Sequence, residues 1–103
     1  MSPHKVDFES LPWETPMKGV RARTFKHGGK QIRLVEYTPA MEPHWCDKGH
    51  YGYVLEGRFE IGFDGETVIY EAGDGVFIPS GGADRHTGKA LTSTVRVVFV
   101  EDL

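Results

Sequence analysis

The sequence contains a single cysteine among 103 residues, and this scarcity limits both its covalent structure and its expected setting. Cys46 has no second cysteine within the chain, so an intrachain disulfide cannot form. The fold must therefore be held together by buried apolar side chains, and a chain of this length can bury a sufficient core. Because disulfides mark oxidising compartments, we expect a cytoplasmic protein.

Long apolar runs and a strong charge imbalance are also missing. No stretch approaches the roughly 18 consecutive apolar residues of a membrane-spanning helix. Residues 1–16 mix charged residues with prolines and lack the apolar segment of a signal peptide. The formal net charge of -3 gives no sign of the basic surface that binds nucleic acid or anionic membranes. We therefore expect a protein that binds neither nucleic acid nor membranes.

Helical periodicity is the third missing feature, since no window repeats its apolar residues at the 3.6-residue period of an amphipathic helix. Thirteen glycines and six prolines instead divide the chain into short segments. Such punctuation is typical of strands joined by tight turns.

Alternating apolar residues predict strands on both sides of two glycine-containing turns. Gly28-Gly29 separates two such segments, and Asp64-Gly65 separates two more. Both pairs tolerate the positive φ angles of a tight turn, so each is predicted to close a hairpin. The expected strands are residues 20–26, 31–38, 51–55, 58–63, 66–70, 76–78 and 94–101.

Short antiparallel strands at this spacing predict an all-β fold, a small antiparallel β-barrel or jelly roll. We assign this barrel to residues 19–103 as one domain. Residues 1–18 are expected to form an irregular arm, and its Leu11 and Trp13 need an apolar surface on the barrel or on a neighbouring subunit. The last strand, 94–101, is apolar on both faces. The arm and this strand together favour a two-fold homodimer.

Metal-binding side chains are concentrated in one short segment. His44, Cys46 and His50 would share one face of an extended chain, because side chains repeat every second residue. His86 follows the Gly81-Gly82 turn and adds a fourth donor. Imidazole and thiolate together suit Zn, Fe, Ni or Cu rather than Mg or Ca. We therefore predict one divalent transition metal on these four side chains.

Over roughly residues 30–100 the chain resembles the cupin superfamily, whose first motif runs G-x5-H-x-H-x3–4-E-x6-G. His44 occupies the first histidine position of that motif and Gly57 its closing glycine. Cys46 replaces the second histidine, His50 replaces the glutamate, and Thr38 stands where the motif opens with glycine. An intact site of this kind would be softer than the usual one, since its anionic donor is a thiolate.

The second motif, G-x5-P-x-G-x2-H-x3-N, is matched at its start by Gly73, Pro79 and Gly81. Asp84 falls at the position of its histidine, and His86 lies two residues later on the same strand face. Either residue can fill the ligand position. The resemblance implies a small barrel whose mouth holds one metal ion and a small organic ligand.

Two further sets of residues complete the predicted site. The side chains expected to line its pocket are Trp45, Tyr51, Tyr53, Phe77 and Asp84, although each aromatic can equally fill the core. No general base is assigned, and Tyr53, Asp84 and Glu42 are the candidates. We expect His4 and His27 to be solvated.

These residues leave three classes of function open. We favour a metal-dependent oxygenase, isomerase or related enzyme acting on a small molecule. The alternative is a non-catalytic ligand-binding or sensory module, with or without metal, in which Cys46 can also act as a redox sensor. A structural role for an empty barrel is the third reading, with Cys46 then a small buried core residue.

Overall fold

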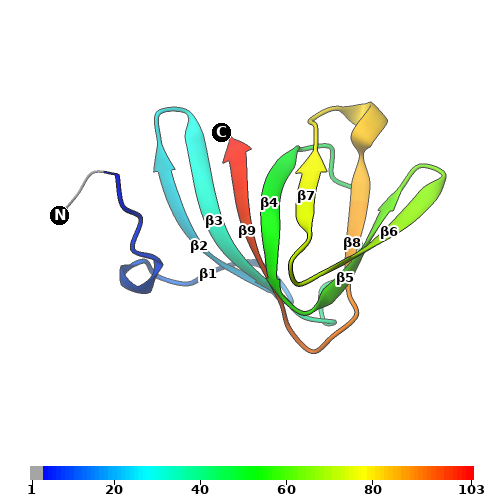
Figure 1. Cartoon of the computed structure of the whole chain (residues 1–103), viewed down its shortest axis with the longest axis horizontal. Helices are drawn as coiled ribbons and strands as arrows, with labels where there is room; N and C mark the ends of the chain where they lie inside the picture. The colour runs from blue at the N-terminus through cyan, green and yellow to red at the C-terminus, as the bar shows by residue number, and fades with distance from the viewer. Residues whose placement is uncertain (1–3) are drawn as a thin grey trace.

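The computed structural model describes residues 4–103, and these residues form an all-β fold as expected. Short turns connect most of its antiparallel strands, and residues 38–49 form a longer loop (Figure 1). The strands of this part of the chain are β1 (Glu14–Met17), β2 (Val20–His27), β3 (Lys30–Tyr37), β4 (His50–Glu56), β5 (Arg58–Phe63), β6 (Glu66–Glu71), β7 (Gly75–Ile78), β8 (His86–Ala90) and β9 (Val95–Asp102). Two 3-10 helices, η1 (Phe8–Ser10) and η2 (Gly82–Asp84), accompany them.

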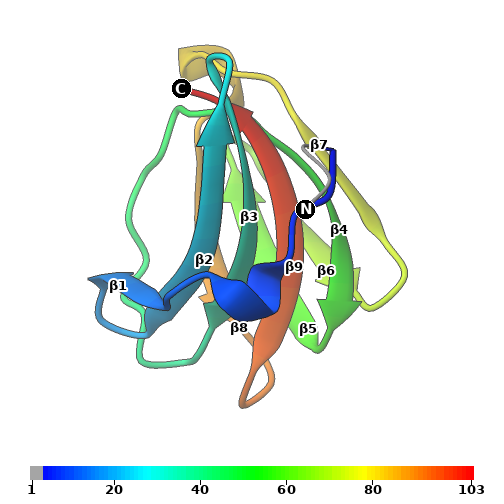
Figure 2. The same cartoon turned by 90° about the vertical axis from the view of Figure 1, so that its left-hand side faces the viewer.

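The strands form two antiparallel sheets that pack as a jelly-roll barrel (Figures 1 and 2). The larger sheet has the order β1-β2-β3-β9-β4-β7 and the smaller one the order β6-β5-β8. The C-terminal strand β9 therefore lies between β3 and β4, far from its neighbours in sequence. Side chains of β9 can therefore contact side chains of both β3 and β4.

Both predicted hairpins are present at the expected turns. Gly28 and Gly29 adopt φ angles of 60° and 77°, and β2 pairs with β3 up to His27 opposite Lys30. Gly65 has a φ of 83°, and the β5–β6 pair closes with Phe63 opposite Glu66. The observed strands differ from the predicted ranges by only one or two residues at their ends.

Two strands have no counterpart in the sequence-based prediction. β8 lacks apolar alternation and is defined by its pairing with β5. β1 contains a proline and pairs with β2, Glu14 opposite Ala22. Trp13, just before β1, lies beneath the guanidinium groups of Arg21 and Arg23, 4.0 and 4.4 Å from the ring centroid. Part of the arm thus packs on its own sheet, while its contact with a partner stays a prediction.

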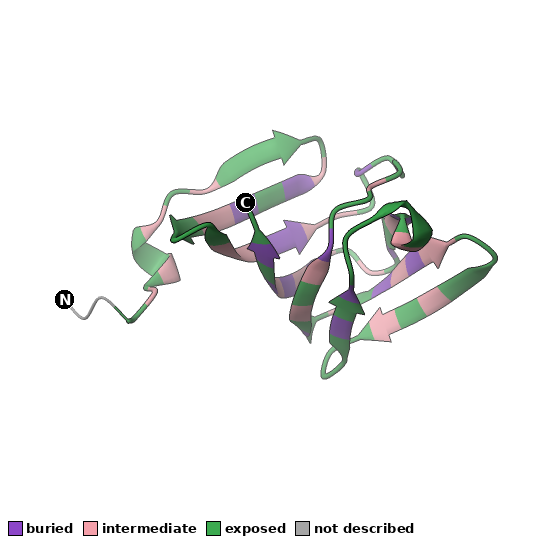
Figure 3. Ribbon diagram, turned by 90° about the horizontal axis from the view of Figure 1, so that it is seen from above, coloured by how far each residue is buried: buried purple, intermediate pink, exposed green. Residues whose placement is uncertain are grey.

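The core lies between the sheets, and its buried residues come from β2, β3, β4, β5, β7, β8 and β9 together with Met41 (Figure 3). On β9, Val95 and Val97 are 0 % exposed and Phe99 is 2 % exposed, whereas Val100 on the opposite face is 41 % exposed. The second apolar face of this strand therefore lies outside the core. Among residues 4–103, no helix has the length and hydropathy needed to cross a membrane.

Candidate metal centre

A cavity of about 290 Å³ lies inside the barrel and combines a polar and an apolar wall. Its apolar wall includes Tyr37, Phe59 and Phe99. Its polar lining is His44, Cys46, Lys48, His50, His86, Gln31, Arg33 and Glu101. Burial raises the pKa of the Tyr37 hydroxyl to about 12, so this group stays protonated at neutral pH.

Three of the four predicted ligands converge in this cavity. One potential ligand atom from each of Cys46, His50 and His86 lies within 4.8 Å of the other two. The backbones of Cys46 and His86 are bridged by two hydrogen bonds of 2.8 Å, which hold the loop before β4 against the start of β8. The rings of His50 and His86 lie 5.2 Å apart, edge to face. Residues from distant parts of the sequence thus form one compact donor group.

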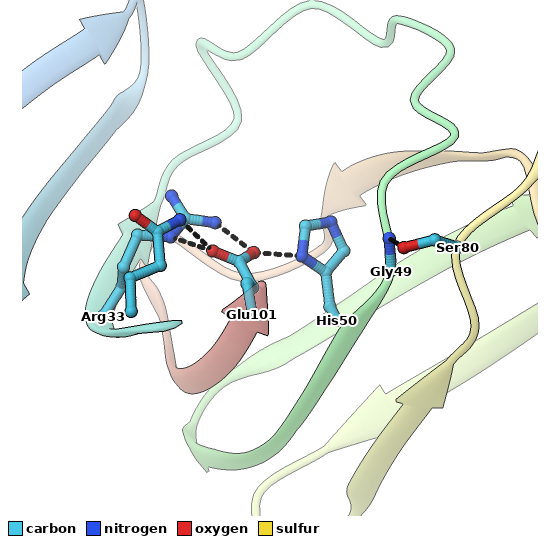
Figure 4. Close-up of polar contacts among 6 residues, drawn as sticks. Arg33, Gly49, His50, Ser80 and Glu101 are labelled. Atoms are coloured by element: carbon cyan, nitrogen blue, oxygen red, sulfur yellow. Dashed lines mark hydrogen bonds and ion pairs between the residues drawn. The ribbon is translucent and has the colours of Figure 1, made fainter. Parts of the chain in front are cut away.

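The start of β4 is fixed by a close backbone approach. The Gly49 amide donates to the Ser80 hydroxyl at 2.8 Å (Figure 4). A Cβ atom at Gly49 would lie 2.6 Å from the carbonyl oxygen of Ile78, so this position has no room for a side chain. The backbone beside His50, which lines the cavity, is therefore fixed in place.

In the three histidines that line the cavity, hydrogen bonds engage one ring nitrogen and leave the other outside these bonds. Nδ1 of His44 lies 3.2 Å from the carbonyl oxygen of Glu42, and Nδ1 of His86 lies 3.0 Å from that of Asp84. Nδ1 of His50 contacts the Glu101 carboxylate. A carbonyl or carboxylate oxygen only accepts, so each Nδ1 carries the hydrogen. Each Nε2 takes no part in these bonds and is the ring nitrogen that can bind a metal.

His86 is neutral near physiological pH. Its burial lowers the pKa of the imidazole, and the nearby rings of His50 and His44 lower that pKa further, against the opposing bond to Asp84. A neutral imidazole is the form that binds metals. This residue, rather than the Asp84 side chain, lies with Cys46 and His50.

Glu101 is the residue of this region that sequence reasoning missed. Its side chain is 0 % exposed, and it accepts hydrogen bonds from Arg33, Gln31 and His50 (Figure 4). Burial opposes the charge, but the bonds from His50 and Arg33 outweigh that effect and lower the pKa of Glu101 to about 2. The signal was present in the strand pattern, because position 101 continues the buried alternation of 95, 97 and 99.

His44 is separated from the other predicted ligands. It is exposed in the loop before β4 and lines the same cavity, but it does not belong to the three-residue donor group. Its ligation of a metal stays a prediction.

None of the predicted pocket-lining residues is among those that line this cavity. On β4, Tyr51 and Tyr53 alternate with His50 and therefore face away from the cavity. Phe77 pairs with Tyr51 across the sheet and is 77 % exposed. Trp45 lies beneath the guanidinium group of Arg85, 4.4 Å from its ring centroid. The backbone carbonyl oxygen of Asp84 accepts a hydrogen bond from Nδ1 of His86.

The donor group suits a transition metal in both chemistry and size. A thiolate and two imidazoles match Zn, Fe, Ni and Cu. Bonds of about 2.0–2.3 Å place two ligands of a tetrahedral ion roughly 3.3–3.8 Å apart. The observed spread of up to 4.8 Å therefore requires the donor atoms to move closer together, by up to about 1 Å, around an ion.

The sequence profile of the cupin domain matches residues 33–101, which is more than half of the chain. The chain belongs to the cupin family. The matched range includes Cys46, His50, His86 and the buried Glu101. No curated protein sequence matches this cupin.

Solved structures share the fold at low sequence identity. An RmlC-like cupin from Shewanella frigidimarina is 19 % identical with a TM-score of 0.75, covering 98 % of this chain and 91 % of that one. The polyketide cyclase RemF from Streptomyces resistomycificus is 22 % identical with a TM-score of 0.76, covering 98 % and 80 %. An HTH_3 family transcriptional regulator from Vibrio cholerae is 17 % identical with a TM-score of 0.67, covering 82 % of this cupin. The cupin spans only 51 % of that regulator's length.

Proposed function

We propose that this cupin binds one divalent transition metal through Cys46, His50 and His86 and holds a small organic molecule beside it. The observation that carries the proposal is the convergence of three donors whose histidines each have Nδ1 bonded to an oxygen, which leaves Nε2 outside these bonds. A metal held there would supply Lewis-acid or redox chemistry. Three protein ligands leave at least one coordination position for a substrate or water.

The cavity supports a ligand that is small and partly apolar. Its volume of about 290 Å³ is near the lower end for small-molecule sites. Tyr37, Phe59 and Phe99 would contact the apolar part of such a molecule, while its polar end would face the donor group. We infer an oxygenase, isomerase or related enzyme. Its proton-transfer residue stays unassigned, because Tyr53, Asp84 and Glu42 do not line the cavity.

The second candidate function is a sensory or ligand-binding module without turnover. It is supported by the similarity to part of a transcriptional regulator. His44 discriminates between the two functions. If a movement of its loop brings His44 to the metal as a fourth ligand, the site is closed, as in structural and sensing centres. If His44 stays outside, the site is open to a substrate.

Metal content tests the proposal. Protein purified without an affinity tag is analysed for metals by mass spectrometry, as wild type and as the variants Cys46→Ala and His86→Ala. His27→Ala is the control, because His27 lies exposed at the β2–β3 hairpin. We expect about one transition metal per chain in the wild type and control and a loss of most of it in both other variants. Equal metal content in all four proteins would contradict the proposal.

Two expectations about the whole protein also remain proposals. Cytoplasmic location fits a site that depends on a reduced Cys46 thiolate, since oxidation would remove that donor. Homodimer formation is the second, and the exposed apolar residues on the outer face of the larger sheet support it.

A further inference from the structure

The buried Glu101 carboxylate does not belong to the three-residue donor group, and its charge sets it apart from the apolar core. It ends the inner row of β9 after Val95, Val97 and Phe99, with a side chain that is 0 % exposed. Burying a charge is costly unless the charge is fully hydrogen-bonded. An apolar residue would have completed the same row at lower cost, so the carboxylate calls for a specific role.

The bonds of Glu101 join three adjacent strands. Arg33 of β3 donates from Nε to Oε1 and from Nη2 to Oε2, each at 2.6 Å. Gln31 of the same strand donates from Nε2 to Oε1 at 2.7 Å. His50 of β4 donates from Nδ1 to Oε2. Since β9 lies between β3 and β4, the carboxylate is fixed from one side and directed toward His50 on the other (Figure 4).

We propose that Glu101 is a positioning residue for the metal centre, one that fixes His50 as the Nδ1-protonated tautomer and aims its Nε2 at Cys46 and His86. Arg33 and Gln31 hold the carboxylate in place and are its anchor. This inference rests on the proposed metal site. The other two histidines that line the cavity, His44 and His86, have backbone carbonyl oxygens as the partners of their Nδ1 atoms. Among the cavity histidines, His50 has a side chain as the partner of its Nδ1, so a single substitution at Glu101 can remove that hydrogen bond.

The chain offers a matched control for this role. Glu36 is also buried, 8 % exposed, and also binds two arginines, Arg21 at 2.8 Å and Arg96 at 2.9 Å. It lies on β3 and points away from the cavity, among charged residues of the outer face. Glu101→Gln and Glu36→Gln therefore remove the same charge from similar ion-pair networks, only one of which includes a histidine.

Two measurements test the role of Glu101. Nitrogen-15 NMR of the metal-free protein gives the His50 tautomer, and competition with a chelator gives the Zn²⁺ affinity. We expect a single Nδ1-protonated tautomer in the wild type and Glu36→Gln. In Glu101→Gln we expect a tautomer mixture and about a 10–100-fold weaker Zn²⁺ affinity. An unchanged tautomer and affinity in Glu101→Gln would overturn the inference, as would an equal loss of affinity in Glu36→Gln.

Two further outcomes are distinguishable. If Glu101→Gln does not fold, the double variant Arg33→Met with Glu101→Gln removes the unpaired guanidinium, and the same two measurements decide. If the wild type binds no Zn²⁺, the proposed function fails. The tautomer of His50 in the metal-free protein then decides separately whether Glu101 orients that ring.

Discussion

At the scale of single residues, the chemistry of the cavity depends on which ring nitrogens of its histidines are already hydrogen-bonded. Each of the three cavity histidines has its Nδ1 bound to an oxygen, so the ring nitrogen that remains is known before any ligand arrives. Cys46 contributes the softer donor. The pairing of its backbone with that of His86 sets the distance between the two side chains.

The sequence predicted three residues that the fold brings together, Cys46, His50 and His86, but it predicted their surroundings only in part. The short segment from His44 to His50 revealed the donors because metal-binding residue types are concentrated there. Glu101 was missed because an acidic residue at a strand end usually reads as solvated. The aromatics of β4 were misplaced because the inward position of His50 turns Tyr51 and Tyr53 outward.

Gly52 is a residue whose replacement should disturb both stability and the site. A Cβ atom there would lie 1.9 Å from the carbonyl oxygen of Val98 and 2.9 Å from Cδ1 of Phe99, the ring that packs against His50 at 4.8 Å. We expect Gly52→Ala to lower the free energy of unfolding by at least about 1–3 kcal/mol. Chemical denaturation monitored by fluorescence measures this change.

Gly75 on the neighbouring strand β7 provides the control for that substitution. Its added Cβ would meet nothing closer than the Gly52 carbonyl oxygen at 3.8 Å, an ordinary contact. Gly75→Ala should therefore alter the unfolding free energy by less than about 1 kcal/mol. A Gly52→Ala protein as stable as Gly75→Ala would show that β4 and β9 are not packed as described.

At the scale of the elements, turn chemistry predicted more of the fold than strand composition did. The Gly28-Gly29 and Asp64-Gly65 turns predicted two hairpins, and positive φ angles occur at both residues of the first pair but only at Gly65 of the second. β8 was not predictable, because His86–Ala90 has no apolar alternation of its own. Its register comes from β5, where Phe63 pairs with His86, a long-range contact that local patterns do not encode.

The position of β9 explains why the site cannot be read from one segment. β9 carries Glu101 between the strands of Arg33 and His50, although more than 50 residues separate Glu101 from His50. Sheet topology brings these side chains together. A sequence pattern indicates which face of each strand is buried but not which strands are neighbours.

At the scale of the whole molecule, the larger sheet exposes an apolar outer face. One row of paired residues crosses five of its strands: Phe25, Ile32, Val100, Tyr51 and Phe77. Four of these are at least 39 % exposed. Charged residues border the row, and they pair within the chain, Lys30 with Asp102 and Glu36 with both Arg21 and Arg96. These pairs form within one chain, so they do not need a partner of opposite charge.

We therefore predict that the homodimer forms through this outer face. Phe77→Ser should weaken the dimer, because it removes the most exposed aromatic of the row. The control is Ile69→Ser, which alters an exposed residue of β6 on the other sheet. Sedimentation velocity at several concentrations measures the association. A wild type that stays monomeric, or a Phe77→Ser dimer as tight as the control, would contradict this assignment.

The central claim is that Cys46, His50 and His86 hold one metal ion, and a cobalt titration tests it most directly. Co²⁺ bound by a thiolate gives a charge-transfer absorption in the near ultraviolet, and its visible bands report the coordination number. Reduced, metal-free wild type should develop both signals and saturate at about one Co²⁺ per chain. Cys46→Ser should lose the charge-transfer band. A wild type without that band, or a band that persists in Cys46→Ser, would contradict the account.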